Sequence, residues 1–224
     1  MASEVDVVNS ALTKLGESRI TSLTDNVKAA REMNAIYTLR RDRLLRAFNW
    51  SFAMERTQLS AAVDAPSWGY TYQYPLPADC MRVVQVDDVW VIPGYSDFIG
   101  GPDEEPFKIE GRNIVTDIGA PLKIRYLKKV TNPATFDACF VESLATDLAV
   151  EACEAITQSN TKKDGLKDDR RQSILEAIRA NAIELPPTAQ PDDSWIASRF
   201  ECPKPRPSFS PSPRGSYRPI STGG

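Results

Sequence analysis

Paired carboxylates are the residues of this chain whose types and spacing are most typical of a catalytic site. Aspartates stand side by side at 87–88 and at 168–169, and an Asp-Glu-Glu run occupies 103–105 between two prolines. Two carboxylates perform general acid–base chemistry when a cleft holds them about 5–9 Å apart. Adjacent side chains of a strand point to opposite faces, and a proline-bounded acidic run is typical of a loop. We therefore interpret these acids as solvated charge, and a carboxylate-dependent hydrolase remains an alternative.

Residues that commonly hold metals or activate nucleophiles are scarce. The chain has no histidine, which is the commonest general base and a common transition-metal ligand. Its cysteines form no CxxC pair and fit no zinc pattern; they are Cys80, Cys139, Cys153 and Cys202. We predict reduced thiols, no metal site, no cofactor and no enzymatic activity.

Composition is ordinary for a globular protein. The 224 residues include 27 basic and 30 acidic ones, which gives a net charge of −3 rather than the basic footprint of a nucleic-acid-binding protein. The N-terminal sequence lacks a basic region followed by an apolar one, and no run approaches ~20 apolar residues. We expect a protein that is used without secretion and does not span a membrane.

Arginines are concentrated in a helical pattern from about Asp25 to Phe48. Four of them follow closely on one another: Arg40, Arg41, Arg43 and Arg46. Such a run can contact phosphate, but it also fits an exposed face or ion pairs between subunits, and both readings stay open. We predict that these arginines form ion pairs with a neighbouring subunit or another partner.

The C-terminal 40 residues hold nine of the 17 prolines, so neither helix nor central strand can persist there. The same stretch nevertheless carries large apolar side chains and an arginine within six positions: Trp195, Ile196, Arg199 and Phe200. Tryptophan and arginine are the types most enriched at binding hot spots. These residues must be buried elsewhere, either on the body of the same chain or on a neighbour, and we predict the neighbour.

The pattern of apolar residues sets the order of elements. Helical spacing occurs at 3–15, at 25–48, from about 134 and at 161–183, whereas 66–131 is rich in β-branched and aromatic residues. We predict an α+β fold, in which an antiparallel helical bundle of 1–64 and 132–184 receives a small antiparallel β-unit at 65–131. An extended proline-rich C-terminal arm follows at 185–224. Whether the β-unit is a barrel or a sandwich stays open.

Several short stretches, taken in order, carry a resemblance to a known family. The opening "VNSALTKLGESRITSLTD" and the following "RDRLLRAFNWSFA" are similar to the first two helices of the tail tubular protein A family, the head-to-tail adaptor proteins of short-tailed bacteriophages. The likeness covers most of residues 3–200. The matching stretches are Leu15-Gly16, Ile20–Leu23, Trp50–Phe52, "YQYPLPADCMRVV" at 72–84 and "DDSWIASR" at 192–199.

The resemblance implies a structural virion protein that is assembled in the host cytoplasm. Such adaptors form a homo-oligomeric ring, typically of twelve copies, that binds the portal protein above and a tail nozzle of the tail tubular protein B type below. Double-stranded DNA passes through the bore. Two alternatives remain: a virion-associated, carboxylate-dependent cell-wall hydrolase, and a monomeric binding module with a proline-rich ligand tail.

Overall fold

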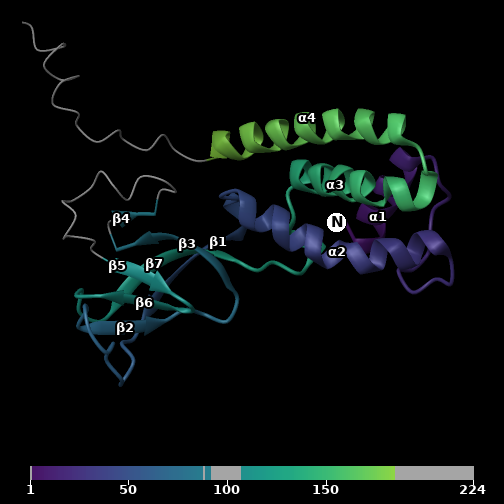
Figure 1. The fold of residues 1–224 in the computed structure, drawn as a ribbon. Coiled ribbons are helices and arrows are strands. Elements are labelled where there is room, and N and C mark those ends of the chain that lie inside the picture. The colour runs from purple at the N-terminus through teal and green to yellow at the C-terminus, as the bar shows by residue number, and fades with distance from the viewer. Residues whose placement is uncertain (1, 88, 92–106, 185–224) are drawn as a thin grey trace, which may run out of the picture. The chain divides into compact units, whose positions relative to one another are not determined.

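The computed structural model of this chain describes residues 2–87, 89–91 and 107–184 (Figure 1). They belong to one compact unit, Met1–Pro186, whereas Pro187–Gly224 falls outside the described residues. The helices of this part are α1 (Glu4–Leu15), α2 (Lys28–Ala47), α3 (Ala138–Thr157) and α4 (Asn160–Glu184). The strands are β1 (Met54–Leu59), β2 (Tyr72–Pro75), β3 (Cys80–Val86), β4 (Val89–Trp90), β5 (Phe107–Glu110), β6 (Asn113–Thr116) and β7 (Leu122–Lys128). The predicted α+β class is confirmed.

Helix α1 begins and ends where its sequence predicts. The Ser3 hydroxyl accepts a hydrogen bond from the Asp6 N–H at 3.1 Å, and the Asp6 carboxylate accepts one from the Ser3 N–H at 2.9 Å. This reciprocal capping box satisfies two N–H groups that the helix itself leaves free. At the other end Gly16 takes a left-handed conformation, with φ of 73°, that a residue with a Cβ adopts only under strain.

Helix α3 is the centre of the helical part. It contacts α1, α2 and α4, and Figure 1 shows it between α4 and the other two helices. Small side chains at Ala145, Ala149 and Ala152 are buried, which lets its neighbours approach closely. Helix α3 is therefore buried on more than one side.

Aromatic rings fill the space where the chain leaves α2. Trp50 is 1% exposed, its ring centroid lies 5.0 Å from that of Phe140, and its Nε1 donates to the Leu44 carbonyl at 3.0 Å. Phe48 and Phe52 pack against the same indole. Because the indole N–H is satisfied, this cluster buries a large aromatic surface without an unpaired donor.

The strands form two antiparallel sheets. One has four strands in the order β1-β7-β3-β4, and the other has three in the order β2-β6-β5. In the first sheet neighbouring side chains face different cores: Val83 joins the core of the β-unit, whereas Val84 joins the core of the helices. This alternation is the period of two expected of a strand, and it leaves the central strands β3 and β7 buried on both faces.

The sheet begins earlier in the chain than the predicted boundary. Strand β1 lies within the range 1–64 that we assigned to helices, and it pairs with β7 from Met54↔Leu127 to Leu59↔Leu122. It is an edge strand, and of its six residues only Leu59 is buried. A mostly polar edge strand shows little of the alternation by which strands are recognised.

Candidate functional site

The first two arginines of the predicted interaction run are engaged within the chain. The Arg40 side chain is 17% exposed and pairs with Glu151. Arg41 is 5% exposed, its Nε donates to an Asp42 carboxylate oxygen at 3.0 Å, and its guanidinium lies 5.9 Å from the centre of the Tyr37 ring. Their charges are therefore compensated inside the folded unit.

Asp147 is a buried carboxylate at the meeting point of three helices. It stands on α3 with its side chain 3% exposed, and its oxygens lie 2.7 Å from Nε of Arg170 on α4 and 3.9 Å from a nitrogen of Arg40 on α2. The Asp147 oxygen and the Arg170 Nε are close but are not aligned for a hydrogen bond. The contact is an ion pair that ties α2 and α4 to α3.

Arginines without a carboxylate partner gather at the junction between α2 and the sheet. Arg46 at the end of α2 donates to the Met81 carbonyl, Arg82 on β3 donates to the Asn49 side chain, and Arg112 donates to the Pro77 carbonyl. We call these three residues, Arg46, Arg82 and Arg112, the junction arginines. All three donate to neutral oxygens, and none has an ion pair among the described residues.

The junction arginines influence one another and the thiol between them. Burial and the positive charge of Arg46 lower the pKa of Arg82, whose Nε is buried without a hydrogen-bond partner in the described part of the chain. Burial raises the pKa of the Cys80 thiol, and the charges of Arg112 and Arg46 oppose that rise. Like charges held together without a carboxylate partner in the described part are suited to bind an anion, and a guanidinium binds carboxylate or phosphate through two parallel hydrogen bonds.

The end of α4 is attached beside this junction. The Asn181 amide donates to the Asn49 carbonyl at 2.8 Å and accepts from the Ser51 N–H at 2.7 Å, and the Ser51 hydroxyl donates to Glu184. The chain therefore leaves α4 next to the residue that Arg82 contacts.

No model of a known protein family matches the sequence, and no curated protein matches it.

Some of the residues predicted to bind a partner lie on the surface of the described part, and others lie outside it. Arg43 is exposed with no ion pair or hydrogen bond within the described ranges, and Arg46 belongs to the junction arginines. The anchors predicted in the arm are outside the described residues: Trp195, Ile196, Arg199 and Phe200. Sequence reasoning missed Arg82 and Arg112, because a single arginine in a strand or a turn carries no signal of what the fold places beside it.

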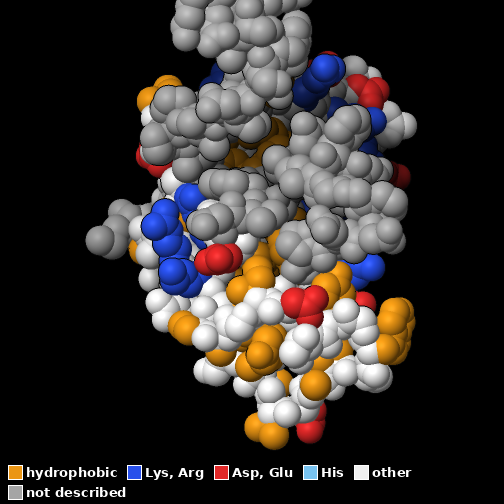
Figure 2. Space-filling view, turned by 90° about the vertical axis from the view of Figure 1, so that its left-hand side faces the viewer, with side chains coloured by type: hydrophobic (Ala, Val, Ile, Leu, Met, Phe, Trp, Pro, Cys, Tyr) orange, Lys and Arg blue, Asp and Glu red, His pale blue; other side chains and the backbone are white. Residues whose placement is uncertain are grey.

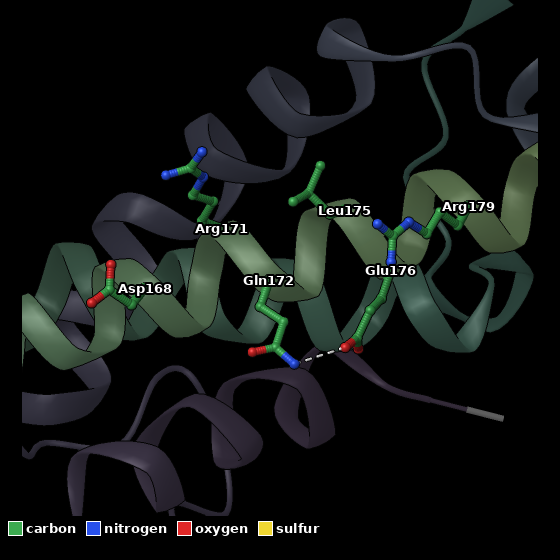
Figure 3. Close-up of a pocket in the computed structure, with 6 residues that line it drawn as sticks. All are labelled: Asp168, Arg171, Gln172, Leu175, Glu176 and Arg179. Atoms are coloured by element: carbon green, nitrogen blue, oxygen red, sulfur yellow. Dashed lines mark hydrogen bonds between the residues drawn. The ribbon is translucent and has the colours of Figure 1, made fainter.

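A second polar surface is the outer face of α4. A shallow hollow of about 400 Å³ is lined by residues of this one helix: Asp168, Arg171, Gln172, Leu175, Glu176 and Arg179. Figure 3 shows Arg171 and Leu175 on one side of the helix and Gln172 and Glu176 on the other. The Gln172 amide donates to Glu176 at 3.0 Å, whereas no partner of Asp168, Arg171 or Arg179 occurs in the described part.

A third polar surface lies on the four-stranded sheet. A hollow of about 380 Å³ is lined by side chains of β1, β3 and β7, among them Arg56, Lys123 and Arg125. Arg56 stands directly across from Arg125 in the antiparallel pairing. Figure 2, which views the side of the molecule where the strands lie, shows lysine and arginine side chains gathered beside apolar ones.

The described carboxylates considered as candidates for acid–base catalysis lie on different elements of the fold. Asp168 and Asp169 are exposed on α4, Asp87 lies at the end of β3, and residues 88 and 103–105 are outside the described residues. In the described ranges no three cysteine or carboxylate side chains form a group that could hold a metal ion. Every helix of the same ranges is too short or too polar to cross a lipid bilayer.

Proposed function

We propose that this chain is a structural virion protein, a head-to-tail adaptor that assembles into a ring of twelve copies between the portal vertex and the tail nozzle. In this role it is an antiparallel helical bundle with an inserted β-unit and an extended arm. The proposal starts from the family resemblance of the sequence. Two of the resembling stretches lie at positions that set the fold, because Gly16 ends α1 and Trp50 is buried in the aromatic cluster.

The observation that carries the proposal is the set of junction arginines. A ring that closes needs two different complementary surfaces on every copy, and an adaptor needs further surfaces for portal and nozzle. Arginine is enriched at the centre of protein interfaces, where it pairs with carboxylates. Three uncompensated guanidiniums on a chain of net charge −3 favour an acidic protein surface as their partner, since nucleic-acid binding requires a broader basic stripe.

The arm supplies the second contact of the proposal. Trp195, Ile196, Arg199 and Phe200 anchor it to a neighbouring copy or to the portal, because a proline-rich segment has no core in which to bury them. Within the arginine run Arg43 and Arg46 are the members left for contact with a partner. The mildly acidic chain also suits a bore through which DNA slides, because a basic lining would retain phosphate by counterion release.

The test is assembly with the portal protein encoded in the same genome, followed by electron microscopy. The full-length chain should add a ring beneath the portal, and the double variant Arg46→Glu/Arg82→Glu should not. Arg31→Glu is the matched control, because Arg31 is an exposed arginine of the same helix about 22 Å from Arg46. Circular dichroism verifies that each variant is folded.

The arm is tested in the same assay with Trp195→Ala/Phe200→Ala in the full chain, which should also abolish docking. A ring that forms normally with both the arginine and the arm variants would overturn the proposed contacts. Absence of any ring with the wild-type chain would overturn the adaptor function itself.

A further inference from the structure

The outer face of α4 has exposed side chains whose order along the helix is complementary to itself. Helix α4 packs against α3 with one side, and of its 25 residues only Leu166 and Ala177 are buried. Asp168, Leu175 and Arg179 are separated by seven and four positions, so they share the opposite face. Leu175 is 46% exposed there, at the hollow that Figure 3 shows.

We propose that this face binds the same face of a second copy, as a two-fold symmetric pair of antiparallel α4 helices. In such a pair every residue stands level with one residue of the other copy. When Gln172 is level with Leu175 of the second copy, Asp168 is level with Arg179 and Gly165 is level with Ala182. The contact is independent of the proposed adaptor ring, which requires a different, head-to-tail interface.

Charge decides the direction of the pair. In the antiparallel arrangement each Asp168 faces an Arg179, so two opposite-charge pairs form, one at each end of the hollow. In a parallel arrangement Asp168 would face Asp168 and Arg179 would face Arg179, which is repulsive. Both residues are exposed and neither has an ion pair or hydrogen bond in the described part of the chain, so both are available for this contact.

At the centre of the pair, apolar surface becomes buried and no polar group loses its hydrogen bond. Leu175 of one copy lies against the methylene groups of Gln172 of the other. The Gln172 amide already donates to Glu176 at 3.0 Å, so its polar end keeps a hydrogen bond when the helices meet. Burying the exposed leucine removes apolar surface from water on both sides of the symmetry axis.

The ends of the pair carry small residues. Gly165 and Ala182 are both exposed, and a Cβ built on Gly165 would meet no atom within 4 Å. A glycine inside a helix is less favourable than alanine, and the described part of the chain shows no packing reason for it. A second helix over this position supplies one, because small residues at both ends let the two helices approach along a contact of about 26 Å.

Sedimentation velocity of the full-length chain over a range of concentrations tests the pair. The wild-type chain should show a monomer–dimer equilibrium that weakens with added salt, because exposed charges are screened. Asp168→Arg alone and Arg179→Asp alone should each weaken dimerisation on the order of tenfold, since an attractive pair becomes a repulsive one at both ends. The combined variant restores opposite charges and should return to within about threefold of the wild type.

Gly165→Leu provides a second measurement that does not depend on charge. Open space surrounds Gly165, so the substitution should preserve or raise the melting temperature while it blocks the close approach of a second α4. A wild-type chain that stays monomeric at every concentration would overturn the proposal. So would a dimer, or a larger ring, that responds to none of these variants. Portal docking is measured separately, so a failed dimer and a failed adaptor are distinguishable outcomes.

Discussion

Neutralising Asp147 should destabilise the folded chain more than any exposed charge of the helices. The variant Asp147→Asn keeps the shape of the side chain but removes the negative charge between Arg40 and Arg170. Arg170 would then stand beside a neutral amide, and Arg40 would keep only Glu151. The expected result is a folded protein with a lower free energy of unfolding.

The size of the effect follows from the burial of the three side chains. Removing one partner of a fully buried ion pair costs about 3–5 kcal/mol, whereas an exposed pair is worth about 0–1 kcal/mol. Asp147 is 3% exposed, but Arg40 is 17% and Arg170 is 31% exposed, so both cations keep access to water. Poor alignment of the Asp147–Arg170 contact lowers the value further. We expect a loss of about 2–3 kcal/mol, or about 5–10 °C in melting temperature.

Thermal and urea unfolding, followed by far-ultraviolet circular dichroism, measure this loss. The matched control is Glu154→Gln on the same helix, since Glu154 pairs with Lys163 at 2.7 Å but is 70% exposed. That variant should change stability by less than about 0.5 kcal/mol. The triple variant Arg40→Met/Asp147→Leu/Arg170→Met replaces the network with apolar side chains and should recover most of the loss.

An equal, small effect of Asp147→Asn and Glu154→Gln would refute the reasoning, because burial would then have no influence on the value of the pair. A triple variant less stable than Asp147→Asn would show that the charges contribute net stability rather than avoiding an uncompensated buried charge.

Three further predictions concern individual side chains. Tyr37→Phe should change stability at pH 7 by less than about 1 kcal/mol, because the buried Tyr37 hydroxyl has no partner in the described part. Burial raises the pKa of Tyr37 to about 12 from 10.0, so this phenol ionises at lower pH in the unfolded chain than in the folded one. The free energy of unfolding of the wild type should therefore fall as the pH rises from about 10 to about 12. Urea titrations should show a smaller fall for Tyr37→Phe. Trp50→Ala should cost about 3–5 kcal/mol in the same assay, while Trp68→Ala, at 87% exposure, should be neutral. Ser3→Ala should cost about 1 kcal/mol, and amide exchange should rise in the first turn of α1.

The sequence predicts local features well where one short stretch determines them. Ser3 and Asp6 alone set the start of α1, and Gly16 alone sets its end. The second helix is a contrast, because no side chain of the polar turn before it caps its first residues. Asp25 instead accepts hydrogen bonds from the Thr21 and Ser22 N–H groups, and the helix begins at Lys28. Several polar residues stand in this turn, and the sequence does not show which of them the fold uses for hydrogen bonds.

The candidate site was less accessible to sequence reasoning because tertiary contacts create it. Arg40 and Arg41 look like Arg43 and Arg46 along the chain, yet helical rotation turns the first two toward Glu151 and Tyr37. Arg82 and Arg112 join Arg46 only because β3 and the turn before β6 meet the end of α2. The arm residues, from Trp195 to Phe200, remain predictions.

The way the first and last helices are joined has a consequence for synthesis on the ribosome. Lys162 donates to the Leu15 carbonyl at the end of α1, 147 residues earlier in the chain, and Lys28 donates to the Ala155 carbonyl. The apolar stripe of α1, including Val8 and Leu12, packs on α3, which is translated after all the strands. At about 5–20 residues per second the newborn helix waits about 7–28 s until α3 has been translated. During that interval its stripe is open to chaperones, and translation speed through the strand region sets how long they have to bind.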